Sequence, residues 1–156
     1  IVGGWINEFN DDISNSLGER KLPCNDQKIK QYLKYRCPMN QATVMFKKAD
    51  VVKAGGYLDW HHEEDYYLWL RMHLQKSKFK NIQKVLVHVR ADKDYYARRG
   101  GMEYFLSEAK LQMYMYKNSI INPLQLIMNI FLRFIVQIVA PNILRRFIFI
   151  LLRRNT

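Results

Sequence analysis

The sequence predicts an α/β fold, a mixed sheet flanked by helices and followed by amphipathic C-terminal helices. Apolar, β-branched segments at the start of the chain and near residues 78 to 89 alternate with segments whose apolar residues recur at helical spacing. The 156 residues are 49% hydrophobic and 13% aromatic, which excludes a disordered chain and is enough for one real core.

The first expected elements are a strand and a hairpin turn. Residues 1 to 9 are apolar in near alternation, and residues 10 to 18 are rich in Asn, Asp, Ser and Gly, which is typical of a turn. Asp11 and Asp12 are candidate metal ligands, but acids in such a turn are more often solvated. We therefore expect a hairpin tip here.

Three short elements follow. Asn25 or Asp26 can cap a helix, and residues 41 to 47 (Gln-Ala-Thr-Val-Met-Phe-Lys) have the composition of a buried strand. Asp50 begins a short helix that Gly55-Gly56 ends, since glycine accepts left-handed backbone geometry. A loop then leads to an acidic motif.

The acids Glu63, Glu64 and Asp65 stand where the next helix is expected to begin. One interpretation is electrostatic: free N–H groups and the helix dipole favour carboxylates there, by roughly 0.3–1 kcal/mol each. The other is catalytic, in which one carboxylate faces a cleft and accepts a proton from a substrate hydroxyl. A metal cluster with His61 and His62 is disfavoured, because adjacent residues entering a helix point about 100° apart.

A strand is expected over residues 78 to 89, followed by a polar, glycine-ended segment at residues 90 to 101. That segment has the composition of a loop that closes over phosphate. Its Arg98 and Arg99 either bind a diphosphate or form a solvated charge pair. A helix begins near Gly101, with an apolar stripe predicted to face the core. This stripe consists of Met102, Phe105, Leu106, Ala109, Met113 and Tyr116.

The formal charge of +11 favours an anionic partner. Between Pro123 and Thr156 there are five arginines and no acid, set among large aliphatic residues, which favours a membrane over nucleic acid. The longest charge-free stretch in this tail, Phe134 to Leu144, has 11 residues, short of the roughly 18–20 that span a bilayer. We expect residues 122 to 156 to form helices lying on the membrane, or else packing on a soluble partner.

Cys24 and Cys37 are the only cysteines. Two isolated thiols without further zinc-type spacing indicate reduced, structural residues and a cytosolic compartment.

Four motifs occur in a fixed order along the chain. They are Cys37-Pro38-Met39-Asn40, Thr43-Val44-Met45-Phe46-Lys47-Lys48, Ala54-Gly55-Gly56-Tyr57 and Glu64-Asp65-Tyr66-Tyr67-Leu68-Trp69-Leu70-Arg71. Together they resemble the second half of a family 2 glycosyltransferase, above all bacterial enzymes that build exopolysaccharide, capsule or O-antigen. The resemblance covers roughly residues 1 to 100, and one departure is Gln41, where many relatives have His.

The resemblance implies a GT-A fold and inverting transfer from a nucleotide-sugar donor to a saccharide or lipid-linked acceptor, as in hexosyltransferases. It assigns the general base to Asp65, with Glu64 beside it, and a Mg²⁺ or Mn²⁺ ion held mainly by an Asp-x-Asp motif. Donor and metal sites belong to the first half of such a domain. We expect that half upstream of Ile1, so the chain given is expected to be an incomplete and inactive fragment.

The residues fit this chemistry. A sugar hydroxyl becomes a nucleophile when a carboxylate takes its proton. We expect Arg98 and Arg99 to bind the leaving diphosphate, and His88 either to reach the metal or to be a satisfied structural histidine. Aromatic faces for stacking the acceptor come from Tyr57, Trp60, Tyr66 and Trp69.

The expected organisation has three parts: a base and acceptor half at residues 1 to 100, a packing helix at 101 to 121, and the basic membrane helices at 122 to 156. Such an enzyme lies peripherally on the cytoplasmic face of the bacterial inner membrane. The alternative function is a non-catalytic module that binds a membrane or a partner; nucleic-acid binding is not expected.

Overall fold

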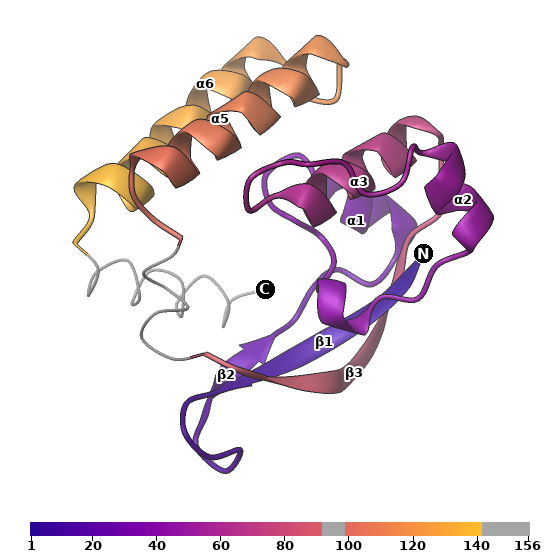
Figure 1. Cartoon of the computed structure of the whole chain (residues 1–156), viewed down its shortest axis with the longest axis vertical. Helices are drawn as coiled ribbons and strands as arrows, with labels where there is room; N and C mark the ends of the chain where they lie inside the picture. Colours follow the sequence, from indigo (N-terminus) through magenta and orange to yellow (C-terminus); the bar gives the residue numbers. More distant parts are fainter. Residues whose placement is uncertain (92–98, 142–156) are drawn as a thin grey trace.

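The computed structural model describes residues 1–91 and 99–141 and confirms an α/β architecture (Figure 1). A small mixed sheet carries a layer containing α1 and α3, and the helical pair α5–α6 lies beyond α3. The sheet order is β2-β1-β3. Its strands are β1 (Val2–Phe9), β2 (Ser16–Arg20) and β3 (Lys80–Arg90).

The strand predicted at the start of the chain is confirmed, and it is the central strand of the sheet. β1 pairs antiparallel with β2, with Ile6 opposite Arg20, and parallel with β3, with Val2 opposite Lys80. The turn between β1 and β2 confirms the predicted hairpin. A Cβ at Gly4 would lie 2.4 Å from Cδ1 of Leu86, so a side chain there would displace Leu86. Glycine at this position lets the Leu86 side chain of β3 lie close to β1.

The first two helices follow their predicted signals. Asn25 caps α1 (Asp26–Tyr32), its side chain accepting a hydrogen bond from the Lys28 N–H. The short helix α2 (Lys48–Lys53) ends at Gly55 and Gly56, whose φ angles of 87° and 69° lie in the left-handed region.

The strand predicted at residues 41 to 47 is wrong. The segment forms the 3₁₀ turn η1 (Gln41–Thr43) and then a single bridge between Met45 and Val2. Side chains replace the ladder: the Asn40 amide donates to Gly4 O at 2.7 Å, and Gly4 N–H donates to the Thr43 hydroxyl at 2.9 Å. These polar contacts hold the segment against β1 while leaving Met45 78% exposed.

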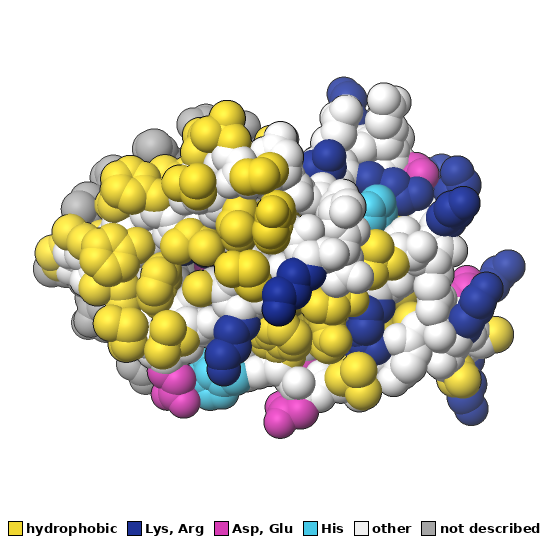
Figure 2. Space-filling view, turned by 90° about the horizontal axis from the view of Figure 1, so that it is seen from above, with side chains coloured by type: hydrophobic (Ala, Val, Ile, Leu, Met, Phe, Trp, Pro, Cys, Tyr) yellow, Lys and Arg dark blue, Asp and Glu magenta, His cyan; other side chains and the backbone are white. Residues whose placement is uncertain are grey.

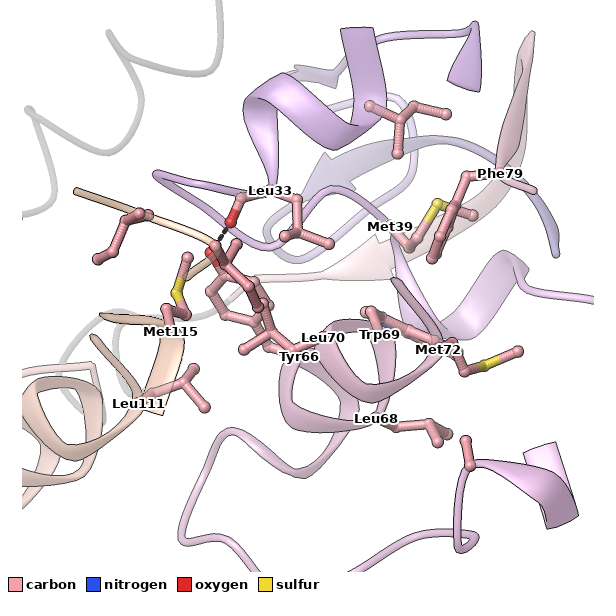
Figure 3. Close-up of a cluster of buried hydrophobic side chains, with 14 of the residues drawn as sticks. Leu33, Met39, Tyr66, Leu68, Trp69, Leu70, Met72, Phe79, Leu111 and Met115 are labelled. Atoms are coloured by element: carbon pink, nitrogen blue, oxygen red, sulfur yellow. Dashed lines mark hydrogen bonds between the residues drawn. The ribbon is translucent and has the colours of Figure 1, made fainter. Parts of the chain in front are cut away.

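The core is built around α3 (Glu64–Leu74), which begins at the predicted acidic motif. Figure 3 shows its side chains packed with Leu33 at the end of α1, Phe79 just before β3, and Leu111 and Met115 of α5. The Tyr66 hydroxyl donates to Leu33 O, which ties α3 to the end of α1. The largest fully buried residues of the chain include Trp69, Tyr66, Leu68, Leu70, Met72, Ile29, Leu33, Leu111 and Met115.

A helical hairpin completes the described chain. It consists of α5 (Met102–Lys117), α6 (Pro123–Phe134) and a π-helical turn, η2 (Ile135–Val139). Asn122 and Gln125 form a capping box at the start of α6, with Pro123 in its first turn. No helix in residues 1–91 or 99–141 is long and apolar enough to cross a membrane.

The helix predicted near Gly101 is confirmed, but its predicted core stripe is wrong. Met102 and Leu106 are 56% and 50% exposed, and Met113 and Tyr116 are also exposed. The buried face instead carries Ser107, Leu111, Gln112 and Met115. The helix is rotated so that several polar side chains face inward.

Candidate active site

A pocket of about 620 Å³ lies at the N-terminus of α3. Its walls come from the end of β2, the segment after α1, the start of α3, and the α5–α6 hairpin. The lining residues are Arg20, Tyr35, Arg36, Cys37, Gln41, His62, Glu63, Glu64, Asp65, Tyr66, Arg99, Tyr104, Glu108, Asn129, Leu132, Arg133, Val136 and Gln137. The pocket therefore joins segments that are far apart in the sequence.

Asp65 stands in this pocket on the first turn of α3, partly buried. Burial raises the pKa of its carboxyl above the ordinary value, and the neighbouring Glu64 adds to the rise. A hydrogen bond from Tyr66 N–H to Oδ1, at 2.6 Å, and the charge of Arg20 act in the opposite direction. The result is a carboxylate of enhanced basicity on a rigid element.

Cys37 and Arg20 lie next to Asp65. The Cys37 thiol donates to Asp65 Oδ2 at 3.8 Å, and Arg20 Nη2 donates to Cys37 O at 3.0 Å. Burial raises the pKa of the thiol well above its usual range, and the Asp65 charge raises it further. Cys37 is thus a protonated neighbour of the carboxylate, and both cysteines are free as predicted.

Glu63 is a second buried carboxyl at the same helix start. It is 6% exposed and accepts a hydrogen bond from the Tyr104 hydroxyl at 2.8 Å. Burial, and then the nearby Glu108, raise the pKa of Glu63 well above its ordinary value. This hydrogen bond connects the start of α3 to α5 of the hairpin.

The pocket carries both signs of charge. Arg20, Arg36 and Arg99 line it together with Glu64 and Asp65. Guanidinium groups beside a carboxylate suit a ligand that has phosphate oxygens and hydroxyl groups. Deeper in the hairpin wall, Arg133 Nε lies 2.8 Å from Glu108 Oε2, and both side chains are largely buried.

Hydrogen bonds fasten the hairpin wall on both sides of the pocket. On the α5 side, Ser107 Oγ donates to His61 O at 2.6 Å, and Trp60 Nε1 donates to Ser107 O at 3.3 Å. On the α6 side, Asn129 Nδ2 donates to Lys34 O at 2.9 Å. The hairpin is thus part of the site.

The four predicted aromatic platforms do not gather in the pocket. Trp69 has no exposed surface and packs in the core, and Tyr66 lines the pocket but is only 1% exposed. The Trp60 ring lies 4.4 Å from the Tyr67 ring, outside the pocket lining. Tyr57 is 46% exposed and also lies outside the lining.

The predicted metal and diphosphate residues are spread differently. Arg99 lines the pocket, whereas Arg98 lies outside the described residues. His88 is exposed on β3, where its Nδ1 lies 3.2 Å from Asn7 Nδ2. Among residues 1–91 and 99–141, no cluster of three His, Cys, Asp or Glu side chains can hold a metal ion. These residues do not fit a complete cation site.

The sequence did not predict five of the pocket residues, namely Arg20, Arg36, Tyr104, Glu108 and Arg133. Their segments lie before and after the acidic motif, and no local pattern connects them to it. Only Arg36 carried a signal, since it directly precedes the Cys37-Pro38 motif.

Comparison with known proteins identifies bacterial relatives. The chain is 35% identical over 149 residues to UDP-Gal:alpha-D-GlcNAc-diphosphoundecaprenol beta-1,3-galactosyltransferase of Escherichia coli, covering 96% of this chain and 54% of that protein. An uncharacterized glycosyltransferase of Haemophilus influenzae is 31% identical over 94% of this chain and 54% of its own. The amylovoran biosynthesis glycosyltransferase AmsE of Erwinia amylovora is 34% identical over 71% of this chain and 41% of its own.

The chain spans about half the length of the curated relatives it matches. No protein-family profile matches the sequence, and no solved structure matches it.

Proposed function

The homologues of this chain are bacterial glycosyltransferases of polysaccharide biosynthesis, and on that premise we propose that it forms the base and acceptor side of an inverting, nucleotide-sugar-dependent hexosyltransferase. One observation carries the proposal: Asp65, whose pKa is raised, stands in a pocket lined by arginines as well as carboxylates. A GT-A arrangement of the complete domain is part of this proposal.

Asp65 is the general base. The oxygen of an acceptor hydroxyl attacks the anomeric carbon of the donor sugar while its proton passes to the Asp65 carboxylate. The bond from that carbon to the nucleoside diphosphate breaks, and attack from the opposite side inverts the configuration. A positioned base of this kind contributes roughly 10²–10⁴-fold to the rate.

We propose further roles for pocket residues around Asp65, in binding the acceptor and the leaving diphosphate. Glu64, one residue earlier, also lines the pocket, and we propose that it accepts a hydrogen bond from another acceptor hydroxyl. Arg99 lines the pocket, and we propose that it stabilises the charge of the leaving diphosphate. Arg20, through Cys37 O, holds the segment that faces the base.

We propose that the donor site, and the ligands of a Mg²⁺ or Mn²⁺ ion, belong to the part of the relatives that this chain does not match. Such an ion neutralises the developing charge of the diphosphate. These 156 residues alone are then expected to transfer no sugar.

The acceptor is a saccharide or a lipid-linked saccharide. By its name, the Escherichia coli relative acts on a GlcNAc unit carried by diphosphoundecaprenol. A lipid-linked acceptor is anchored in a membrane. We therefore propose that the protein works at the cytoplasmic face of the bacterial inner membrane, where the basic tail at residues 122 to 156 contacts anionic lipid.

The test is sugar transfer by the full-length protein carrying Asp65→Asn. Loss of the base is expected to lower turnover by about 10²–10⁴-fold while the protein stays folded. Asp59→Asn is the matched control, since Asp59 is exposed and outside the pocket lining. Equal turnover of Asp65→Asn and the wild type would contradict the proposal and favour a non-catalytic binding module.

A further inference from the structure

We infer that the outer face of the α5–α6 hairpin lies on an anionic membrane surface and brings the Asp65 pocket to an acceptor anchored in the same bilayer. The outer face is defined by Leu106 of α5 and by Leu124, Ile127, Phe131, Leu132 and Val139 of α6 and η2. The part that concerns the acceptor rests on the proposed function; the membrane contact does not.

The α6–η2 part of the hairpin reverses the usual pattern of a helix in water. In α6 the outward residues are apolar, with Leu124, Ile127 and Phe131 exposed by 66%, 65% and 60%. The residues that face the protein, Asn129 and Gln137, are polar and almost fully buried. Surface helices of soluble proteins show the opposite pattern, and large exposed apolar patches mark contact with a partner or a membrane. Figure 2 shows the apolar side chains gathered over this face.

Specific hydrogen bonds fix this orientation. Asn129 Nδ2 donates to Lys34 O and to Gln112 Oε1, at 2.9 and 2.8 Å, and Gln137 Nε2 donates to Glu108 Oε2. Turning α6 to bury its apolar residues would break these bonds and leave buried polar groups unpaired. The apolar face is therefore held outward.

The positive charge of this part of the chain favours an anionic bilayer as the partner of the outer face. From Ala109 to Thr156 the sequence contains no Asp or Glu. Besides Arg133, which pairs with Glu108, it contains Lys110, Lys117, Arg145, Arg146, Arg153 and Arg154. Cations that accompany an apolar helix face are typical of helices lying in the interface of an anionic bilayer. No helix in the described part of the chain is long and apolar enough to cross that bilayer.

The same helix forms the wall of the pocket. Leu132 is 54% exposed on the outer face and also lines the pocket, together with Arg133 and Val136. An acceptor in this pocket is thus within reach of the bilayer on which α6 lies. The fitting acceptor is an amphiphile, whose sugar enters the pocket and whose hydrocarbon chain stays in the membrane.

The test is co-sedimentation of the full-length protein with phosphatidylcholine vesicles, with and without phosphatidylglycerol. The variant is Leu124→Gln/Ile127→Gln/Phe131→Gln. The matched control, Met45→Gln/Val52→Gln/Leu58→Gln, alters three apolar residues that are 78%, 64% and 44% exposed elsewhere on the surface. We expect the α6 variant to bind anionic vesicles at least about tenfold more weakly and the control to bind like the wild type.

Sugar-transfer assays test whether the hairpin brings the Asp65 pocket to an acceptor anchored in the same bilayer. With the α6 variant, transfer to a lipid-anchored acceptor in vesicles is expected to fall, and transfer to a water-soluble analogue is expected to persist. Unchanged vesicle binding, or the loss of an oligomer in sedimentation without loss of vesicle binding, would overturn the inference. A wild type that binds vesicles but transfers no sugar would instead refute the proposed function alone.

A fluorescence measurement tests the assigned face independently, in case the triple α6 variant does not fold. A polarity-sensitive fluorophore attached at Ile127→Cys is expected to shift to the blue on anionic vesicles, whereas the same label at Val52→Cys is not. Equal responses at the two positions would contradict the assigned face.

Discussion

Asp65 holds a charge where burial disfavours it. The folded protein raises the pKa of this carboxyl above 3.8, so the folded state binds a proton more tightly than the unfolded state. Its contribution to stability is therefore greatest at low pH and is lost as pH rises through the folded pKa. At neutral pH the ionised carboxylate costs stability, as is common for catalytic groups.

Asp65→Asn is accordingly expected to melt at the same or a higher temperature than the wild type near neutral pH. The neutral amide avoids the cost of burying charge, and its oxygen can still accept the Tyr66 N–H. The difference is expected to shrink as pH falls toward about 4. Thermal unfolding at several pH values measures it, and a clearly lower melting temperature at neutral pH would contradict the assigned electrostatics.

Glu63 gives a second prediction at this scale. Its raised pKa favours the neutral acid, so Glu63→Gln is expected to change the free energy of unfolding by less than about 1 kcal/mol. Glu63→Ala leaves the Tyr104 hydroxyl without its acceptor and is expected to cost about 1–3 kcal/mol. Urea unfolding compares the two. Equal losses for both variants would show that the carboxylate charge itself is required.

The sequence predicted Asp65, Glu64 and Arg99 as site residues, and all three line one pocket. It did not predict Trp69 as a core residue, because helical spacing is the same for a ring that stacks on a ligand and a ring that packs inside. Arg20 was not predicted as a site residue for another reason: its position beside Asp65 depends on the pairing of β2 with β1.

Among the elements, α3 also organises the turn after α2. Its Arg71 is buried, donates from both Nη atoms to Ala54 O and Gly56 O, and lies over the Tyr67 ring at 4.4 Å. A planar guanidinium can satisfy two carbonyls at a helix end at once. This contact links the Ala54-Gly55-Gly56 turn to α3.

Arg71→Lys is expected to lower the free energy of unfolding by about 1–3 kcal/mol, because one ammonium cannot replace both contacts. Arg90→Lys is the matched control, since Arg90 is exposed at the end of β3 and is expected to change stability by less than about 0.5 kcal/mol. Chemical denaturation measures both. Similar losses for the two variants would contradict the role assigned to Arg71.

Element prediction succeeded where local patterns decide and failed where tertiary contacts do. The caps of α1 and the glycines after α2 are local, and both were predicted. Residues 41 to 47 have strand composition, yet Asn40 and Thr43 bond to Gly4 and replace a ladder with a turn. The apolar stripe of α5 was assigned to the core because soluble helices usually bury such a stripe, whereas here Gln112 faces inward.

For the whole molecule, the docking of the hairpin on the α/β part decides the shape of the pocket. Asn129 is 2% exposed and connects α6 to Lys34 O after α1 and to Gln112 of α5. These bonds hold one wall of the site in place. They also hold the apolar face outward.

Asn129→Ala is expected to lower the free energy of unfolding by about 1–3 kcal/mol, since two buried partners lose their donor. It is also expected to speed amide hydrogen exchange in α6. Asn118→Ala is the matched control, because the Asn118 amide bonds only within the exposed end of α5. Unchanged exchange in α6 would show that other contacts hold the hairpin.

The most direct test of the account is the pH dependence of kcat/KM for sugar transfer by the full-length protein. If Asp65 is the general base, kcat/KM is expected to fall about tenfold per pH unit below an apparent pKa that lies above the ordinary aspartate value of 3.8. A kcat/KM that stays constant through this acidic range, or falls only below the ordinary value, would contradict the central claim.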